Sequence, residues 1–309
     1  MNSMKLPKRV VLSRKGFDSS AGGFASPIFS DGQMVSLPIP ENRSHKNVTY
    51  SFNDLRKPTG RDFSISEILK RLHPSFDSSQ KVHLDPDIRP SLRPKNTHDP
   101  LGYFGQDDTS MKELQNNGVC DPDNQSLFLF YGWYKGVGMS NDGNLYYERA
   151  QKDELRTHHQ HMIWGWLQSE GYPRRIPESG LSQELKQFAH HPHIEERNRK
   201  NNYIFVSKKK LSFADDIPGV GVFSHYDLSL RLTCSKELNK RSSWLVPAFL
   251  HPCARGRIEK ALWSPEGKNM RVEYRGYGQE FIFDTVGFEA ETSEWLGRIF
   301  QCVGTRNSA

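Results

Sequence analysis

The chain has 309 residues, with 42 Lys and Arg against 36 Asp and Glu, and a formal net charge of +6. Hydrophobic residues make up 35%, but the 11% of aromatic residues exclude general disorder. Four scattered cysteines without a C-x-x-C pair exclude a disulfide scaffold. No apolar stretch approaches the length of about 20 residues that crosses a bilayer, so we expect a cytoplasmic protein with no membrane partner. The mild positive charge permits nucleic-acid binding without requiring it.

The first predicted element is a buried strand at residues 8–13, followed by a glycine-rich polar loop at 14–23. Such a loop can present backbone N–H groups to a phosphate. Asp18 could orient a metal ion or a ribose hydroxyl. The P-loop pattern is absent, and a tight strand exit with solvated charges explains the loop equally well. The candidate nucleotide or phosphate ligands in this loop are Arg14, Lys15, Ser19 and Ser20.

The next region combines regular elements with a long loop. Residues 27–39 predict a hairpin, and residues 64–72 predict an amphipathic helix with Ser64 and Glu67 in a capping box. Residues 83–108 are rich in Pro, His and Asp, which is typical of a loop. Loops of that length inside a compact chain are usually functional or disordered.

The long loop contains two carboxylates one residue apart. In an extended segment stiffened by Pro86, Asp85 and Asp87 are expected to point to the same side. Such oxygens suit Mg²⁺ or Mn²⁺ beside a phosphate, or general acid–base catalysis together with His83. An Asp-x-Asp pair is also common in ordinary turns. Gln106, further along, could read a base edge.

From residue 127 the pattern becomes aromatic and β-prone. Strands are predicted over residues 127–134, 161–168 and 202–206, and their spacing favours a small barrel or a curved sheet. Trp133 and Trp166 could stack on a base, with Lys and Arg beside them for phosphates. A hydrophobic core is the better interpretation for most of the other aromatics, because both faces of the first strand are apolar.

Two histidine groups, at residues 158–161 and 190–193, could hold zinc. No cysteine lies at a useful spacing, so ordinary loop histidines are the better interpretation. A histidine in a polar pocket titrates near neutral pH, which leaves catalysis by His83 or His161 open.

Several segments together resemble a known family, the third of the nucleotide modification associated domains. They occur in the order VVLSRKGFDSSAGGFASPIFSDGQMVSLPIP, HLDPD, GYFGQ, LFLFYGWY, HHQHMIWGWLQ, YIFVS and GQEFIFD. The resemblance covers roughly residues 8–300 and implies a bacterial or phage role near DNA base modification. Residues 127–206 are also similar in pattern to PUA-like modules such as the EVE and ASCH groups. That similarity implies a small barrel in which Trp133, Trp166 and His161 surround a base.

We therefore expect an α+β protein, with a mixed sheet, a PUA-like β-barrel core and peripheral helices. Strands are also predicted at 243–247 and 280–284, and a closing helix at 288–300. Residues 1–309 would form one large domain. Its first half, 1–125, would hold the nucleotide and phosphate site, and 126–309 the barrel.

The function expected is group transfer by a transferase acting on a modified nucleobase or nucleotide. Asp18, Asp85 or Asp87 would serve as base or metal ligand, with Mg²⁺ or Mn²⁺ as the metal. The partners would be a nucleotide or DNA that contains a modified base, together with other base-modification enzymes. The alternatives are a non-catalytic reader of modified DNA bases and a metal-dependent nuclease acting on modified DNA, in which Lys15 or Lys81 would assist the carboxylates.

Overall fold

A computed structural model describes residues 5–41, 47–93, 100–186, 188–238, 240–274 and 280–304. The strands are β1 (Arg9–Arg14), β2 (Ser26–Ile28), β3 (Tyr103–Gln106), β4 (Leu127–Met139), β5 (Leu145–Tyr147), β6 (Gln160–Gln168), β7 (Arg174–Arg175), β8 (Tyr203–Val206), β9 (Lys210–Leu211), β10 (Ala214–Pro218), β11 (Val220–Val222), β12 (Ser243–Pro247), β13 (Ala254–Arg255), β14 (Leu262–Glu266), β15 (Asn269–Glu273) and β16 (Glu280–Asp284). The helices are α1 (Ile65–Leu72), α2 (Asp108–Asn116), α3 (Gln183–Lys186), α4 (Pro192–Glu195), α5 (Leu250–Cys253) and α6 (Glu289–Gly304).

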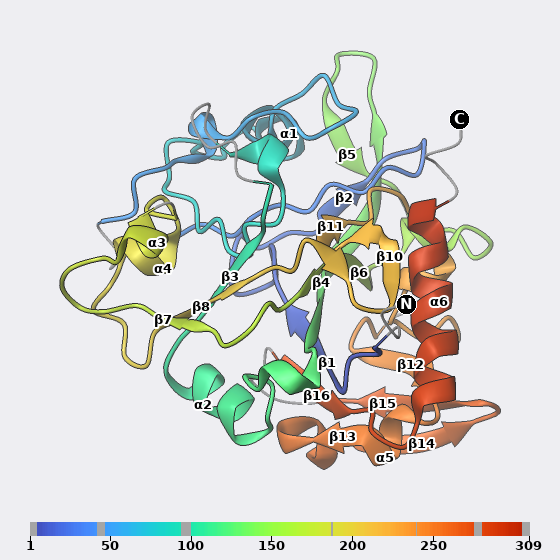
Figure 1. The fold of residues 1–309 in the computed structure, drawn as a ribbon. Coiled ribbons are helices and arrows are strands. Elements are labelled where there is room, and N and C mark those ends of the chain that lie inside the picture. The colour runs from blue at the N-terminus through green and yellow to red at the C-terminus, as the bar shows by residue number, and fades with distance from the viewer. Residues whose placement is uncertain are drawn as a thin grey trace.

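The centre of the molecule is an open mixed sheet in the order β11-β6-β4-β1-β16-β13, with β2 and β5 paired to β4 (Figure 1). The class is α+β as expected, but the PUA-like barrel is not found in the described residues. The reason is that β1 runs parallel along the free edge of β4, and β16 then pairs antiparallel with β1. These additions extend the sheet instead of closing it, and strands from both expected halves of the chain share it.

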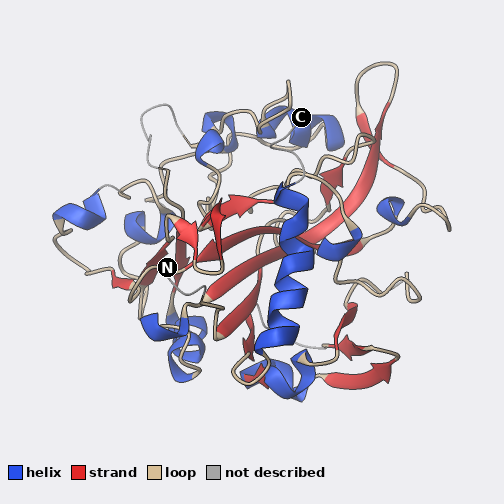
Figure 2. Cartoon of the chain, turned by 45° about the vertical axis from the view of Figure 1, so that its right-hand side comes forward, coloured by secondary structure: helices blue, strands red, loops and turns tan. Residues whose placement is uncertain are grey.

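Helix α6 covers one side of this sheet (Figure 2). The predicted closing helix is confirmed and runs four residues further, to Gly304. Its buried residues Leu296 and Ile299 join the main hydrophobic core, and the ring of Phe300 lies 5.2 Å from that of Trp166. Burial of such apolar side chains is the main force that holds the helix on the sheet.

Helix α1 is confirmed with its capping box. The Ser64 hydroxyl accepts the Glu67 N–H at 3.2 Å, and the Glu67 carboxylate accepts the Ser64 N–H at 2.6 Å. The apolar face of α1 is buried in a second cluster, which also contains Phe17 of the loop after β1. This cluster therefore connects the predicted phosphate loop to the body of the protein.

Strand β3 was not predicted, because it lies within the Pro- and Asp-rich segment read as a loop. Tyr103 and Phe104 are fully buried, and β3 pairs antiparallel with β8 in a small sheet that also contains β7. The expected hairpin at 27–39 is reduced to one bridge between Ile28 and Met34. In the described part of the chain, no helix is long and apolar enough to span a membrane.

Candidate functional site

A cavity of about 790 Å³ lies at the carboxyl end of β1, where the chain enters the glycine-rich loop. Segments far apart in sequence meet in its wall. Most of the predicted phosphate and catalytic residues are among its lining: Arg14, Lys15, Asp18, Ser20, His83, Asp85 and Gln106. The loop, the HLDPD segment and β3 therefore form one site.

The glycine-rich loop is held by its own side chains. Asp18 Oδ1 accepts hydrogen bonds from the Ser20 N–H and hydroxyl, both at 2.7 Å, and from the Ala21 N–H at 2.8 Å. Such an Asx turn fixes the backbone without help from a ligand. Ser19 does not line the cavity; its hydroxyl lies 3.3 Å from Nη2 of Arg241.

Lys15 extends from the end of β1 toward Asp85. Its Nζ lies 3.4 Å from Asp85 Oδ2 and 4.7 Å from the centre of the Phe104 ring. Gly132 on β4 makes room for this turn, since a Cβ there would lie 2.8 Å from the Lys15 carbonyl oxygen. The ammonium group is thus in the cavity wall, between the sheet and β3.

The Asp85 side chain is fully buried, and its two oxygens have different surroundings. Oδ1 accepts the Gly105 N–H at 2.7 Å and lies 3.3 Å from His191 Nε2. Oδ2 faces Lys15. Burial opposes the charged carboxylate, but Lys15 and the histidines outweigh it and lower the pKa of Asp85 well below its usual range.

Asp87 does not join this site. Arg93 Nε donates to both carboxylate oxygens, at 2.8 and 2.9 Å, and His190 Nε2 lies 3.0 Å from Oδ2. Both members of the Asp87–Arg93 pair are almost completely buried, and neither lines the cavity. The prediction that Asp85 and Asp87 bind a metal ion together is therefore corrected, because both oxygens of Asp87 already accept from Arg93 in an internal ion pair.

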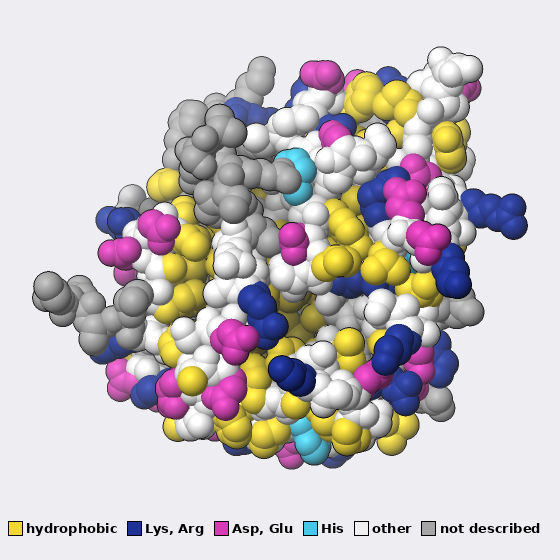
Figure 3. Space-filling view, turned by 90° about the vertical axis from the view of Figure 1, so that its right-hand side faces the viewer, with side chains coloured by type: hydrophobic (Ala, Val, Ile, Leu, Met, Phe, Trp, Pro, Cys, Tyr) yellow, Lys and Arg dark blue, Asp and Glu magenta, His cyan; other side chains and the backbone are white. Residues whose placement is uncertain are grey.

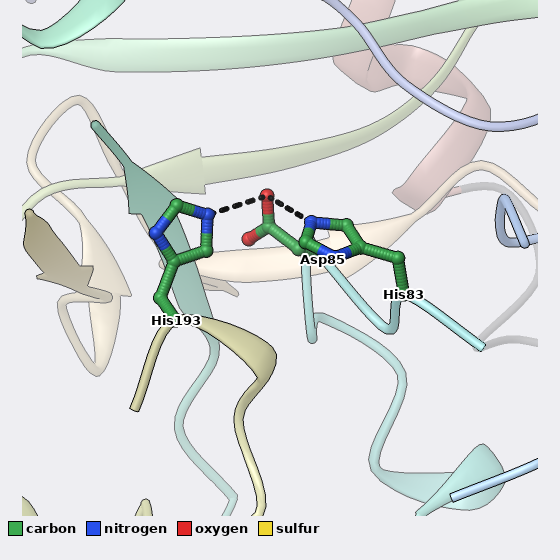
Figure 4. Close-up of side chains that lie close together, drawn as sticks. All are labelled: His83, Asp85 and His193. Carbon is green, nitrogen blue, oxygen red and sulfur yellow. Dashed lines mark ion pairs between the residues drawn. The ribbon is translucent and has the colours of Figure 1, made fainter. Parts of the chain in front are cut away.

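Two histidines approach Asp85 Oδ2 from opposite sides (Figure 4). His83 Nε2 lies at 3.8 Å and His193 Nε2 at 4.0 Å. The other ring nitrogen of each is held: His83 Nδ1 lies 2.6 Å from Glu41 Oε2, and His193 Nδ1 lies 2.8 Å from Asn202 Oδ1. His83, Asp85 and His193 each offer one ligand atom, and these three atoms lie within 4.8 Å of one another, a grouping that could hold a metal ion.

Gln106 lines the cavity but is already anchored. Its Nε2 donates to Glu280 Oε1 at 2.5 Å, and the Ser13 hydroxyl donates to the same oxygen at 3.3 Å. Burial raises the pKa of Glu280 above its usual value. Glu280, at the start of β16, was not recognised as a support of the site from sequence.

The three residues predicted to bind a base lie in different surroundings. Trp166 is 3% exposed, and its Nε1 donates to the Pro218 carbonyl in the main core. Trp133 is half-buried under the guanidinium of Arg241, 4.1 Å from the ring centre. His161 lies opposite Trp133 across the β4–β6 pair, and its Nδ1 accepts the Nε1–H of Trp244 at 3.0 Å.

Several cavity residues were missed from sequence: Glu41, Asp107, His193, Arg199 and Arg257. The clustering of histidines at 190–193 is the sequence signal that could have found His193. Its polar surroundings in sequence favour ordinary loop histidines, whereas His191 and His193 are buried beside Asp85. Arg199 lies between the two cavity acids Asp107 and Glu41, with its Nη1 at 3.1 Å from Asp107 Oδ2.

A second cavity of about 800 Å³ lies beside Tyr134 and Trp164. It is mostly apolar, and its cationic side chains are Arg89, Lys208 and Lys209. The clustered carboxylates and histidines of the first cavity make that one the better candidate for chemistry.

On the α6 side of the molecule, Lys and Arg side chains are interspersed with acidic and hydrophobic ones (Figure 3). Broad contact with a nucleic-acid backbone requires a basic patch or stripe instead. The mild positive charge of the chain is therefore not gathered on this face.

A family model described as nucleotide modification associated domain 3 matches residues 9–284. The match includes the strand and loop that lead into the cavity, the HLDPD segment, β3 and His193 of α4. The chain belongs to this family, which indicates a role in nucleotide modification. No curated protein and no solved structure matches the chain.

Proposed function

We propose that the protein is a nucleotide-modifying enzyme that transfers a group to a nucleobase or nucleotide bound in the cavity of about 790 Å³. The observation that carries the proposal is the convergence of the loop after β1, the HLDPD segment and β3 on that one cavity. Its volume lies within the range of about 300–1,000 Å³ that is typical of small-molecule sites.

The proposed site has two ends, and Lys15 connects them. Arg14 and Lys15 are the cations of the loop, where a phosphate would bind, and Lys15 also pairs with Asp85 of the other end. Asp85 and His83 form the reacting end, and Asp18 keeps the loop in shape. Because Asp85 is held ionised, its proposed role is to bind a cation or stabilise positive charge, not to accept a proton.

The partner in this proposal is a nucleotide, or DNA containing a modified base, handled in the cytoplasm beside other base-modification enzymes. Trp133 keeps a proposed base-binding role, since Arg241 contacts both its ring and the Ser19 hydroxyl of the loop. Base stacking on an aromatic side chain contributes about 1–3 kcal/mol per base.

Binding and turnover test the proposal separately. The full chain would be mixed with the four deoxynucleoside monophosphates and with oligonucleotides containing 5-hydroxymethylated pyrimidines, and binding would be measured by calorimetry. Lys15→Met is expected to weaken binding of the preferred probe at least about tenfold, since charge-assisted hydrogen bonds are worth about 1.5–3 kcal/mol. Lys236→Met, which removes an exposed charge paired to Glu266, is the matched control and should bind like the wild type. Equal binding by Lys15→Met and wild type would contradict the proposed phosphate end.

Turnover distinguishes the enzyme from a reader of modified DNA. Mass spectrometry of the nucleotides after incubation with cell extract should reveal a mass change that Asp85→Asn abolishes while binding persists. A reader would instead bind modified DNA without any product, tolerate Asp85→Asn, and fail in Trp133→Ala. Cleavage of modified DNA that depends on added divalent metal would favour the nuclease.

A further inference from the structure

The two oxygens of Asp85 differ in a way that the proposed function does not explain. Oδ1 is satisfied inside the protein by the Gly105 N–H and faces His191. Oδ2 instead faces the Nε2 atoms of His83 and His193, together with the Lys15 ammonium. The carboxylate is thus held by one oxygen, and the other is directed at two imidazole nitrogens and one ammonium group.

The histidine tautomers are fixed by acceptors on the far side of each ring. Glu41 Oε2 accepts the Nδ1–H of His83 at 2.6 Å. Asn202 Oδ1 accepts the Nδ1–H of His193 at 2.8 Å, and the Asn202 amide is oriented by its own Nδ2–H bond to the His193 carbonyl at 2.8 Å. A proton on Nδ1 leaves the lone pair on Nε2. Oxygen acceptors behind metal-binding imidazoles are the usual support of a metal site.

We infer that His83, Asp85 and His193 bind one divalent transition-metal ion through Nε2, Oδ2 and Nε2. The role of the ion in catalysis rests on the proposed function, whereas the position of the metal site rests on these contacts alone. Atoms that share an ion at about 2.0–2.2 Å lie about 3.0–3.5 Å apart. The two histidine nitrogens lie 3.8 and 4.0 Å from Asp85 Oδ2, and all three ligand atoms lie within 4.8 Å of one another, so side-chain rotations would have to draw them together around an ion.

The ligand set selects the kind of ion. Two imidazoles and one carboxylate suit Zn²⁺ or Fe²⁺ and leave coordination positions open toward the cavity. Mg²⁺ prefers oxygen ligands in an octahedron and disfavours imidazole. The ion is therefore expected to be of the zinc or iron type, and not the Mg²⁺ that the carboxylates alone had suggested.

Lys15 provides the competing explanation. Its ammonium lies 3.4 Å from Asp85 Oδ2 and neutralises that charge without any metal. If the cluster is only an internal ion pair, removal of Lys15 leaves an unpaired carboxylate and creates no metal affinity. If the cluster is a metal site, Lys15→Met removes a repelling charge and tightens binding of the ion.

The test uses the full chain, stripped with a chelator and titrated with Zn²⁺ against a chromophoric competitor, with Mg²⁺ in parallel. We expect one Zn²⁺ per chain, bound at least about 100-fold more tightly than Mg²⁺. Lys15→Met should bind Zn²⁺ more tightly than the wild type. Absence of a stoichiometric Zn²⁺, or weaker Zn²⁺ binding by Lys15→Met, would overturn the inference.

Variants around the cluster locate the ion. His193→Ala is expected to lose the stoichiometric Zn²⁺, and Glu41→Gln to weaken it about 10–100-fold, since it removes only the support of His83. His159→Ala is the matched control, because His159 bonds Trp133 away from the cluster and should leave Zn²⁺ binding unchanged. Circular dichroism would show that each variant is folded, and Glu41→Gln decides the matter if His193→Ala is not.

Nucleotide binding by the metal-stripped protein separates the two proposals. Nucleotide binding without Zn²⁺ uptake would overturn the metal inference alone. Zn²⁺ uptake without binding of any nucleotide or modified oligonucleotide would overturn the proposed function alone.

Discussion

Asp85 and Asp87 are separated by a single proline, yet they lie in opposite kinds of environment. Both are buried and both have a lowered pKa. Asp87 has a guanidinium across both oxygens and lies outside the cavity. Asp85 keeps one oxygen for Lys15 and the imidazoles of the cavity wall. Both carboxylates are therefore buried and charged. They differ because one oxygen of Asp85 faces the cavity, whereas both oxygens of Asp87 are paired inside the protein. We call Asp85 part of the candidate site and the Asp87–Arg93 pair an internal support.

The largest expected effect concerns the support. Arg93→Met should lower the free energy of unfolding by about 3–5 kcal/mol, because it leaves the Asp87 carboxylate buried without its main partner. Urea denaturation measures the loss. The control Arg271→Met breaks the more exposed pair with Glu237 and should cost about 0–1 kcal/mol. Equal losses in the two variants would show that the Asp87–Arg93 pair is no internal support.

The second prediction disturbs the Asp85 side alone. A Cβ at Gly105 would lie 2.2 Å from the His193 ring, so Gly105→Ala must displace that ring. We expect a loss of about 1–3 kcal/mol in the free energy of unfolding, typical of overpacking. Gly297→Ala, in open space on α6, should cause no loss. A Gly105→Ala protein as stable as the wild type would mean that His193 is free to move.

The third prediction compares the two carboxylates directly. Asp85→Asn should cost only about 1–2 kcal/mol, since the amide oxygen can still accept the Gly105 N–H and the Lys15 ammonium can turn into the cavity. Asp87→Asn should cost more, because Arg93 is 0% exposed and has no such exit. Paired thermal and urea denaturation would reveal the order. The reverse order would contradict the assignment of site and support.

The smallest expected effect is on the pH dependence of stability. It concerns His161, which lies outside the surroundings of both Asp85 and Asp87. Burial, together with the charges of Arg241 and Arg14, lowers the pKa of His161 to about 3. In the unfolded chain His161 gains a proton near pH 6.5, so stability falls as pH falls from there toward pH 3. One such group contributes at most about 1.4 kcal/mol per pH unit.

His161→Gln should therefore flatten the dependence of unfolding free energy on pH between 6.5 and 4.5 in urea denaturation, while Gln still offers Trp244 an acceptor. An unchanged slope would mean that His161 is already accessible to protons in the folded protein.

Local sequence patterns predicted the elements whose structure depends on residues close together in the sequence. Helix α1 follows from its capping box and apolar face, and α6 from the spacing of Trp295, Leu296 and Ile299. Strand β3 was missed because its neighbours in sequence are Pro, Asp and Gly, and its partner β8 lies about a hundred residues away. Only tertiary pairing makes it a strand.

The candidate site was foreseen only in part. The sequence indicated the loop after β1 and the HLDPD segment as candidates, and residues of both line one cavity. It could not indicate that Arg93 occupies Asp87, because a six-residue separation in a loop has no fixed geometry. Nor could it indicate that His193 faces Asp85, since the two are over a hundred residues apart and meet only through the contact of α4 with β3.

The position of β1 has a consequence for how the protein folds. This strand, Arg9–Arg14, pairs with β4 and with β16, which spans Glu280–Asp284. Glu280, which anchors Gln106, lies on that last strand. Contacts so distant in sequence form slowly during folding. The wall of the cavity that Gln106 and Glu280 complete therefore depends on a pairing between the first and last strands of the central sheet in chain order, so the cavity is expected to form late in folding.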